Sequence, residues 1–173
     1  MKKPQAGFTI VELLIVIVVI AILAAISIVA YNGIQNRAYD TTVKSDLASI
    51  AKKFQLYQVD VGNYPLTSAE LSKVDATVSK SAYLVSPDTI YNLVPCITTG
   101  GEDFSIAAIS KSGKRYYVGS STGDVKEFSG ASVWTNSSAY STMCSNTLTG
   151  SSLPVGGGAP GYGSGWRPWL AGQ

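Results

Sequence analysis

The chain has 173 residues, which is enough for a membrane anchor and one modest domain. Charged residues make up 14% of it, well below the roughly 25% of ordinary soluble proteins. The sequence contains no histidine, so it excludes histidine-based catalysis and histidine metal sites, and with them most common hydrolase and zinc chemistry.

An apolar run begins at Leu13. Every residue from 13 to 26 is Leu, Ile, Val or Ala, and after Ser27 the run resumes as far as Tyr31. These 19 residues would reach roughly 28 Å as a helix, close to the ~30 Å hydrocarbon core of a bilayer. Because lipid offers the backbone no hydrogen-bond partners, we expect a membrane-spanning helix.

Two residues before this run distinguish it from an ordinary anchor. Glu12 places a carboxylate directly ahead of the apolar residues, where an unpaired charge drawn into the bilayer would cost several kcal/mol. Gly7 separates a short leader, basic at Lys2 and Lys3, from the apolar helix. A glycine has no side chain to obstruct an extended backbone in a protease cleft. We therefore expect Glu12 to need a partner and the chain to be easy to cut at Gly7.

At these residues the chain resembles the type IV pilins and the related pseudopilins of type II secretion. The shared pattern is a basic leader, a glycine at the cut, Phe8, Thr9, two apolar residues, Glu12 and a long apolar helix. The resemblance implies cleavage between Gly7 and Phe8 by a prepilin peptidase and methyltransferase, with N-methylation of Phe8. It also implies that helices pack into a filament in which Glu12 pairs with the Phe8 amine of a neighbouring subunit.

The sequence departs from the family within the apolar helix. Many relatives carry a helix-disturbing glycine where this chain has Ala21, and a proline where it has Val29. Gly33 lies just beyond, so any bend that the family needs is expected there. Two other interpretations stay open: a secretory signal peptide cut near Ala25-Ile26-Ser27, and a plain signal-anchor. Neither explains an acid at the head of the apolar region.

After the span, the residues to Asp60 predict a continuation of the same helix. Apolar residues recur at steps of three and four and so share one helical face: Leu47, Ile50, Phe54, Tyr57 and Val61. Lys44, Asp46, Lys52 and Lys53 fall off that stripe and are expected to face solvent. The whole helix, from Thr9 to Asp60, would be about 52 residues and on the order of 78 Å long.

The sequence Gly62-Asn63-Tyr64-Pro65 predicts the end of the helix, since glycine suits the C-cap and Pro65 forces Tyr64 out of helical geometry. The capping-box spacing from Thr67 to Glu70 then predicts a short helix of about two turns. Further on, a period of two, interrupted by turn-rich segments, predicts a three-stranded antiparallel meander. Its strands are Phe104 to Ile109, Arg115 to Gly119 and Asp124 to Phe128. We expect its apolar face to lie on the helix stripe.

Cys96 precedes the predicted meander and Cys144 follows it. Two cysteines in an exported domain form a disulfide more often than they stay free, and a bond here would stabilise the fold by roughly 4 kcal/mol. Two unpaired core thiols are the alternative.

The acidic residues Glu102, Asp103 and Asp124 are the only candidates for a metal, and some major pseudopilins bind calcium in this region. Adjacent carboxylates on a loop are usually just solvated, so we predict no metal and no cofactor. Beyond Gly150 the chain is rich in Gly, Ser and Pro, and it ends in a motif with Trp166 and Trp169. We expect the two tryptophans to dock on this domain or on a neighbouring subunit.

The predicted fold class is α+β: a long N-terminal helix, with a transmembrane half and an amphipathic half, packed on a small antiparallel sheet in the pilin-like ladle. The expected segments are a leader (1–7), a transmembrane and filament-core helix (8–31) and its amphipathic continuation (32–61). A globular head with the meander near 103–128 (62–149) and a Gly/Pro-rich tail (150–173) follow.

The predicted function is that of a structural filament subunit, not an enzyme. Its partners would be copies of itself and related pilins, the peptidase, an inner-membrane assembly platform and, before assembly, membrane lipid. The head would lie outside the cytoplasm. Without Lys2 and Lys3 the 13 basic residues become 11, which balance 11 acidic ones, so nucleic acid is not indicated. The alternative is a membrane-anchored binding domain that never polymerises and binds through its aromatic tail.

Overall fold

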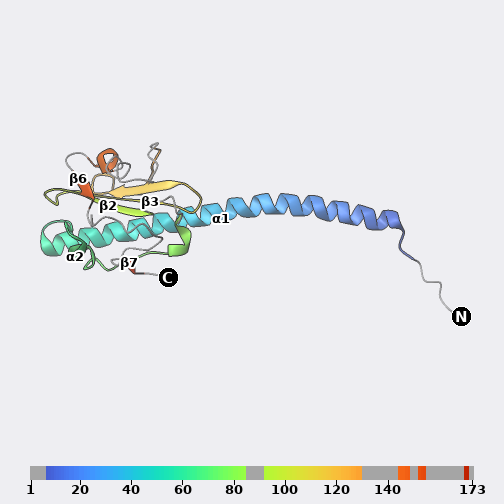
Figure 1. Cartoon of the computed structure of the whole chain (residues 1–173), viewed down its shortest axis with the longest axis horizontal. Helices are drawn as coiled ribbons and strands as arrows, with labels where there is room; N and C mark the ends of the chain where they lie inside the picture. Colours follow the sequence, from blue (N-terminus) through green and yellow to red (C-terminus); the bar gives the residue numbers. More distant parts are fainter. Residues whose placement is uncertain (1–6, 85–91, 130–143, 149–151, 155–169, 172–173) are drawn as a thin grey trace. The chain divides into compact units, whose positions relative to one another are not determined.

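The structure is a computed structural model that describes residues 7–84, 92–129, 144–148, 152–154 and 170–171 (Figure 1). The chain divides into two compact units, residues 1–36 and 37–173. The first contributes the apolar half of the longest helix. The second combines the other half of that helix with a β-sheet, so the α+β fold class predicted from the sequence is confirmed.

Helix α1 runs from Ile10 to Val61, 52 residues, and continues without a break through Ala21, Val29 and Gly33. Ser27, the one polar side chain inside the apolar run, donates its hydroxyl to the carbonyl oxygen of Leu23 at 2.8 Å. This bond satisfies the hydroxyl within the helix itself.

The helix ends as predicted. Gly62 has a φ of +96° and its N–H donates to the carbonyl of Gln58 at 2.7 Å. Tyr64 then donates its backbone N–H to the carbonyl of Gly101 at 2.9 Å, which ties the end of α1 to the sheet. Gly101 has a φ of +75°, and an added Cβ would lie 3.1 Å from that of Asn63, so both the turn and the contact need glycine here.

The predicted apolar stripe of the second half of α1 is buried at Leu47, Ile50, Phe54 and Tyr57, and Val43 extends it by one turn. Val61 does not belong to it: 52% of this side chain is exposed, because the chain turns away at Gly62 and no element covers the last residue of the helix. The expectation that Val61 packs on the head was therefore wrong.

Asp46 was expected to face solvent as a free charge. Its carboxylate instead accepts the backbone N–H of Ser79 at 2.8 Å and the Tyr83 hydroxyl at 3.1 Å. Burial raises the pKa of the Tyr83 phenol far above its usual value, and the negative charge of Asp46 adds to this shift. The pair thus fastens the segment after α2 to the flank of α1.

The main sheet has five strands in the order β5-β4-β3-β2-β6, all antiparallel to their neighbours. The predicted meander forms one side of it, as β3 (Phe104–Ile109), β4 (Arg115–Gly119) and a shorter β5 (Lys126–Glu127). Two strands were missed, β2 (Leu93–Thr98) and β6 (Ser152–Pro154). Pro95 in the middle of β2 argues against a strand in the sequence, since proline cannot donate to the ladder.

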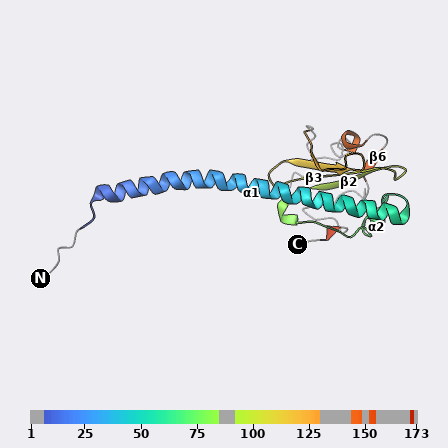
Figure 2. The ribbon, with the colours of Figure 1, turned by 180° about the vertical axis from the view of Figure 1, so that it is seen from behind.

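Both faces of β2 and β3 are buried, and different parts of the chain cover them (Figures 1 and 2). Phe104, Ile106 and Ala108 point toward α1, where the Phe104 ring lies 5.2 Å from that of Phe54 and 4.6 Å from that of Tyr64, centroid to centroid. The alternate residues of β2 and β3 point to the other face, which Cys144 and Leu148 cover. The sequence pattern predicted a cover for only one face of the sheet, the face that lies on α1.

The capping box at Thr67 and Glu70 is present, but α2 spans only Ser68–Leu71, one turn instead of the two predicted. A 3-10 turn follows at Lys80–Ala82. Strand β1 (Ala76–Thr77) pairs in parallel with β7 (Leu170–Ala171), so residues at the far end of the chain return to the segment that follows α2.

Candidate functional site

The segment ahead of α1 is exposed and non-helical. Residues 7–9 have no regular secondary structure, and 84% of the Phe8 side chain is accessible. A Cβ added to Gly7 would meet no atom within 4 Å, so the fold itself does not require glycine there. The bond between Gly7 and Phe8 is thus open to a protease that needs an extended backbone, as the predicted cut requires.

Glu12 closes a capping box at the start of α1. Its Oε2 accepts the backbone N–H of Thr9 at 2.8 Å and the Thr9 hydroxyl at 2.7 Å, and its own N–H donates to the Thr9 Oγ1 at 3.2 Å. Thr9 was not recognised from the sequence as a partner of Glu12. The threonine to glutamate spacing that revealed the box at Thr67 was available here too.

This geometry leaves half of the carboxylate available. Both bonds from Thr9 end on Oε2, and the Oε1 atom of Glu12 has no hydrogen bond among the residues that the structure describes. The carboxylate can therefore keep its cap and still accept a cation. The sequence carries no charged residue from 13 to 36, so Glu12 is an isolated acidic group at the start of an otherwise uncharged stretch of α1.

The apolar half of α1 buries none of its large side chains. From Ile10 to Ile34 their exposed fractions range from 48% at Val19 to 80% at Ile10, on every side of the helix. This is the one described helix that is long and apolar enough to cross a membrane, by length and composition. Such a surface is far larger than the apolar patches that soluble monomers leave in water, so it needs lipid or other protein around it.

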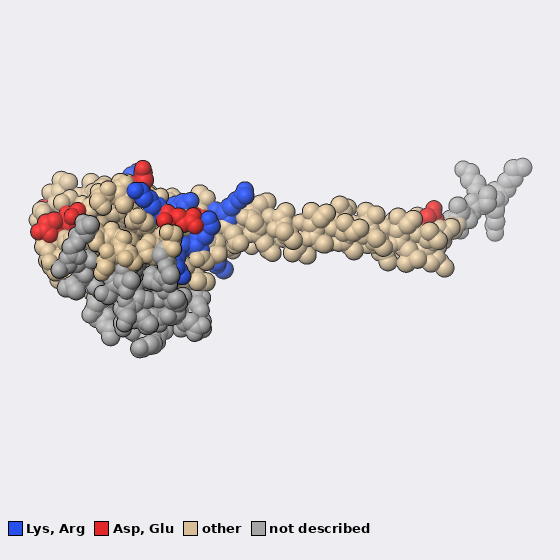
Figure 3. Space-filling model, turned by 90° about the horizontal axis from the view of Figure 1, so that it is seen from above, with Lys and Arg blue, Asp and Glu red and all other residues tan. Residues whose placement is uncertain are grey.

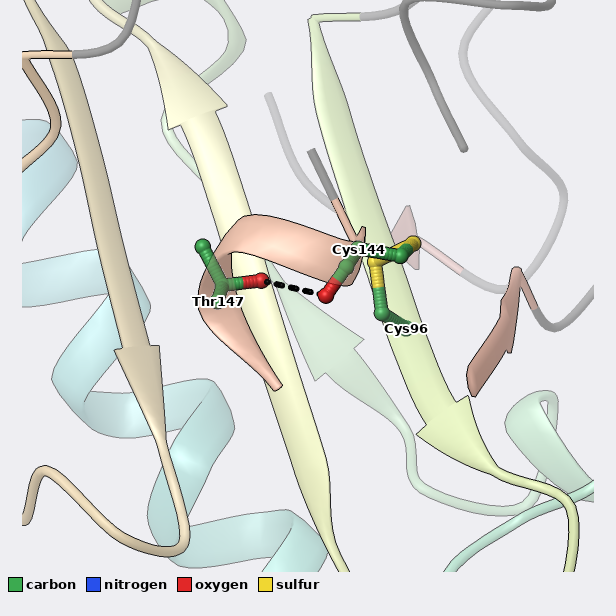
Figure 4. The surroundings of a disulfide bond; sticks show 3 residues. All are labelled: Cys96, Cys144 and Thr147. Carbon is green, nitrogen blue, oxygen red and sulfur yellow. Dashed lines mark hydrogen bonds between the residues drawn. A yellow bond between two sulfur atoms is a disulfide. The ribbon is translucent and has the colours of Figure 1, made fainter. Parts of the chain in front are cut away.

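The predicted disulfide is confirmed. Cys96 and Cys144 are bonded, with their Cα atoms 5.5 Å apart and 48 residues between them in the sequence (Figure 4). We expected Cys96 to precede the sheet, but it lies within β2. The bond fixes the helical turn at 144–147 on the face of the sheet that α1 leaves uncovered, where both cysteines are fully buried.

The acidic residues of the β2–β3 turn have local partners. Glu102 Oε2 accepts the Thr98 hydroxyl at 3.1 Å, and Asp103 Oδ1 accepts the Ser120 hydroxyl at 2.7 Å, while Asp124 is exposed. Within the described parts of the chain, no three His, Cys, Asp or Glu residues gather closely enough to hold a metal ion. Trp166 and Trp169 lie outside the described residues.

Comparison with known proteins points to the same N-terminal region. Residues 2–28 match the family model described as the prokaryotic N-terminal methylation motif. The chain is 31% identical over 86 residues to the type II secretion system core protein G of Aeromonas hydrophila, which covers 50% of this chain and 58% of that protein. No solved structure matches the chain.

Two further relatives show a similar extent of likeness. The type IV wide pilus major component PilA4 of Thermus thermophilus is 45% identical over 65 residues, 38% of this chain and 50% of that protein. The type II secretion system core protein G of Pseudomonas aeruginosa is 33% identical over 70 residues, 40% and 49% of the two chains. The chain thus spans about half the length of the curated relatives that it matches. In its methylation motif and its apolar helix the chain is thus similar to type IV pilins and type II secretion pseudopilins.

Proposed function

We propose that this chain is a structural subunit of a type IV pilus or pilus-like filament, with no catalytic role of its own. The observation that carries the proposal is the apolar half of α1, whose large side chains are all exposed and which bears a single acid at its start. A membrane can cover this surface before assembly, and copies of the same helix can cover it afterwards. The named relatives belong to a pilus and to secretion systems, which does not favour a binding domain that never polymerises.

In the proposed pathway a prepilin peptidase cuts between Gly7 and Phe8, and the new Phe8 amine is methylated. The subunit then stays inserted in the membrane, with its head outside the cytoplasm, until an assembly platform moves it into the filament. This order agrees with the exposed, non-helical segment at residues 7–9 and with the helix that begins directly after it.

Glu12 is the proposed assembly residue. In a filament core the apolar residues of neighbouring helices would surround its carboxylate, which must then be paired. The free Oε1 gives the Phe8 amine of a neighbouring subunit a place to bind while Thr9 keeps its bonds to Oε2. Because the amine exists only after the cut, this pairing would also admit only processed subunits.

The test is the Glu12→Val variant expressed as the only copy of the chain. Removing one partner of a buried ion pair costs about 3–5 kcal/mol, which reduces docking more than roughly a hundredfold. We expect membrane insertion and processing to persist while filaments disappear from fractions sheared off the cells. Normal filament number and length in this strain would show that the carboxylate is not needed.

The chain contains its own matched control. Glu70 forms a capping box with Thr67 in which the Thr67 N–H lies 2.9 Å from the carboxylate and the return bond is 3.2 Å, close to the values at Glu12. Glu70→Val removes the same kind of cap outside the apolar half of α1, so filaments should still form. If sheared fractions of the wild-type strain lack the chain and the membrane retains all of it, the filament proposal itself is wrong.

A further inference from the structure

Basic side chains gather at one end of the folded unit (Figure 3). Arg37 and Lys44 lie on α1, and Lys111 and Lys114 lie on the turn that joins β3 to β4. All four residues are exposed. We refer to these four residues as the basic patch. Nothing in the proposed assembly mechanism uses them.

The fold brings the two parts of the basic patch together. Ser112, in the middle of the β3–β4 turn, donates its hydroxyl to the carboxylate of Asp40 on α1. The Lys111 ammonium lies 5.3 Å from the centre of the Tyr39 ring, and the Lys44 ammonium lies 4.7 Å from the centre of the Tyr116 ring. The turn is therefore held against α1 next to Tyr39, and Lys111 of the turn and Lys44 of α1 each lie over an aromatic face that favours cations.

The patch keeps a net positive charge after its acidic neighbours are counted. Asp40 is engaged by Ser112, and Glu127 pairs with Lys114 at 3.2 Å. Four positive and two negative side chains leave a local charge of +2, whereas the chain without its leader lysines is neutral, with 11 basic and 11 acidic residues. Among the described residues, Arg37, Lys44 and Lys111 form no ion pair. Positive charge is thus concentrated at this end of the unit.

The basic patch is also close to the apolar half of α1 along the chain. Ile34 is the last large exposed apolar residue before it. At the rise of an α-helix, Arg37 lies about 4.5 Å beyond Ile34 along the helix axis, and Lys44 lies about 15 Å beyond Ile34. The field of a charged membrane surface extends over about one Debye length, roughly 8–10 Å. If the apolar half spans a bilayer, Arg37 lies within about one Debye length of the lipid headgroups and Lys44 within about two.

We propose that the basic patch binds the phosphate groups of anionic lipids in the leaflet where the apolar half of α1 leaves the membrane, before the subunit assembles. The inference rests on the membrane anchoring that the proposed function includes. Lipid fits better than nucleic acid because the patch begins at Arg37, shortly after the last apolar residues of the anchor along the chain, whereas a neutral mature chain has no long-range attraction for a polyanion. Entry into a filament would then require these contacts to break.

The experiment uses the full chain in nanodiscs of phosphatidylcholine alone or of phosphatidylcholine mixed with phosphatidylglycerol. Insertion is checked first by co-purification with the discs. A water-soluble amine reagent then labels the lysines, and mass spectrometry gives the rate at each position. Lys52 and Lys73, which are exposed and outside the patch, serve as internal references. We expect labelling of Lys111 and Lys114 to slow about fivefold in the anionic discs, the factor expected from about 1 kcal/mol per basic residue near such a surface. High salt should remove this protection.

Two variants sharpen the test. The double substitution Arg37→Gln and Lys111→Gln removes two of the four positive side chains and brings the local charge from +2 to zero. The protection of Lys44 and Lys114 by anionic lipid should therefore fall. The control, Lys52→Gln with Lys53→Gln, removes as much charge elsewhere, keeps Lys73 as the internal reference and should leave that protection unchanged. Equal labelling in both kinds of disc, or protection by a short duplex DNA but not by anionic lipid, would overturn the proposal. A chain that does not insert at all would overturn the membrane anchoring as well.

Discussion

The two halves of α1 form one continuous helix, but their apolar side chains are buried in one half and exposed in the other. In the second half, Leu47, Ile50 and Phe54 are fully buried under the sheet of their own chain. In the first half, apolar residues occupy every side of the helix and all of them are exposed. The second half has a stripe that one folded unit can cover, whereas the first half has no polar side to leave in water. The first half therefore depends on lipid or on other protein to cover it, and the second does not.

The largest expected effect lies at the start of the exposed half. Gly7→Val should block removal of residues 1–7 almost completely, because a β-branched side chain would obstruct the protease cleft, while the fold should not change, since a Cβ at Gly7 meets nothing within 4 Å. Gly33→Val is the matched control, because Gly33 is equally open. Mass spectrometry of the intact chain measures both. A mature form of the Gly7 variant that begins at Phe8 would contradict the assigned cut.

The second prediction compares the two halves directly. Phe54→Ala should lower the free energy of unfolding of the head by about 3–5 kcal/mol, because it opens a cavity between α1 and the Phe104 ring. Ile20→Ala, at a fully apolar but exposed position, should leave that free energy unchanged. Hydrogen exchange of the β3 amides in the detergent-solubilised full chain reports it. Equal losses in the two variants would mean that the halves of α1 are not independent.

A third prediction concerns the cover on the second face of the sheet. Replacing Cys96 and Cys144 together by alanine should lower the free energy of unfolding by about 2–4 kcal/mol, because a closed loop of this length restricts the unfolded chain. Reduction of the wild-type chain should have a similar effect. Exchange of the β2 and β3 amides measures both, with the apolar half of α1 as the reference that should not respond. Unchanged protection in the double variant would show that the bond adds little to the packing around it.

The smallest effect is expected at the two capping boxes. Thr67→Ala should lower the stability of the head by about 1 kcal/mol. Thr9→Ala should leave the head unaffected, because the half of α1 that Thr9 caps belongs to the other unit.

Acid should remove the contribution of the Glu70 box. The N–H groups of Leu66 and Thr67 hold the pKa of Glu70 below its ordinary 4.5. The stabilisation that the charged Glu70 carboxylate gives the head is therefore present above pH 4.5. It is lost as the pH falls through the lower pKa that Glu70 has in the folded state. Glu70→Gln should thus destabilise the head at neutral pH and make little difference at a pH below both pKa values. The same difference at both pH values would show that the carboxylate charge plays no part.

Local patterns in the sequence were enough to predict much of the structure. The length of α1, its end at Gly62, the box at Thr67 and the strands β3 and β4 all depend on residues close in the chain, where hydrogen-bond spacing and side-chain period act directly. The Gly7, Phe8 and Glu12 motif also lies within a short stretch of the chain, and its roles in cleavage and assembly stay predictions. The pairing of Cys96 with Cys144 was predictable because no other cysteine is present.

Only the tertiary structure decided how distant segments meet. Strand β2 carries a central proline and is a strand because β3 and β6 pair with it on both sides. The turn at 144–147 covers the second face of the sheet, Asp46 binds Ser79, and the β3–β4 turn joins Arg37 and Lys44 in a basic patch. Apart from the pairing of β2 with β3, each of these contacts joins residues more than thirty positions apart. A periodic pattern can reveal that a face is apolar, but which distant segment covers it depends on the whole chain, because shape and hydrogen-bond partners are matched only in three dimensions.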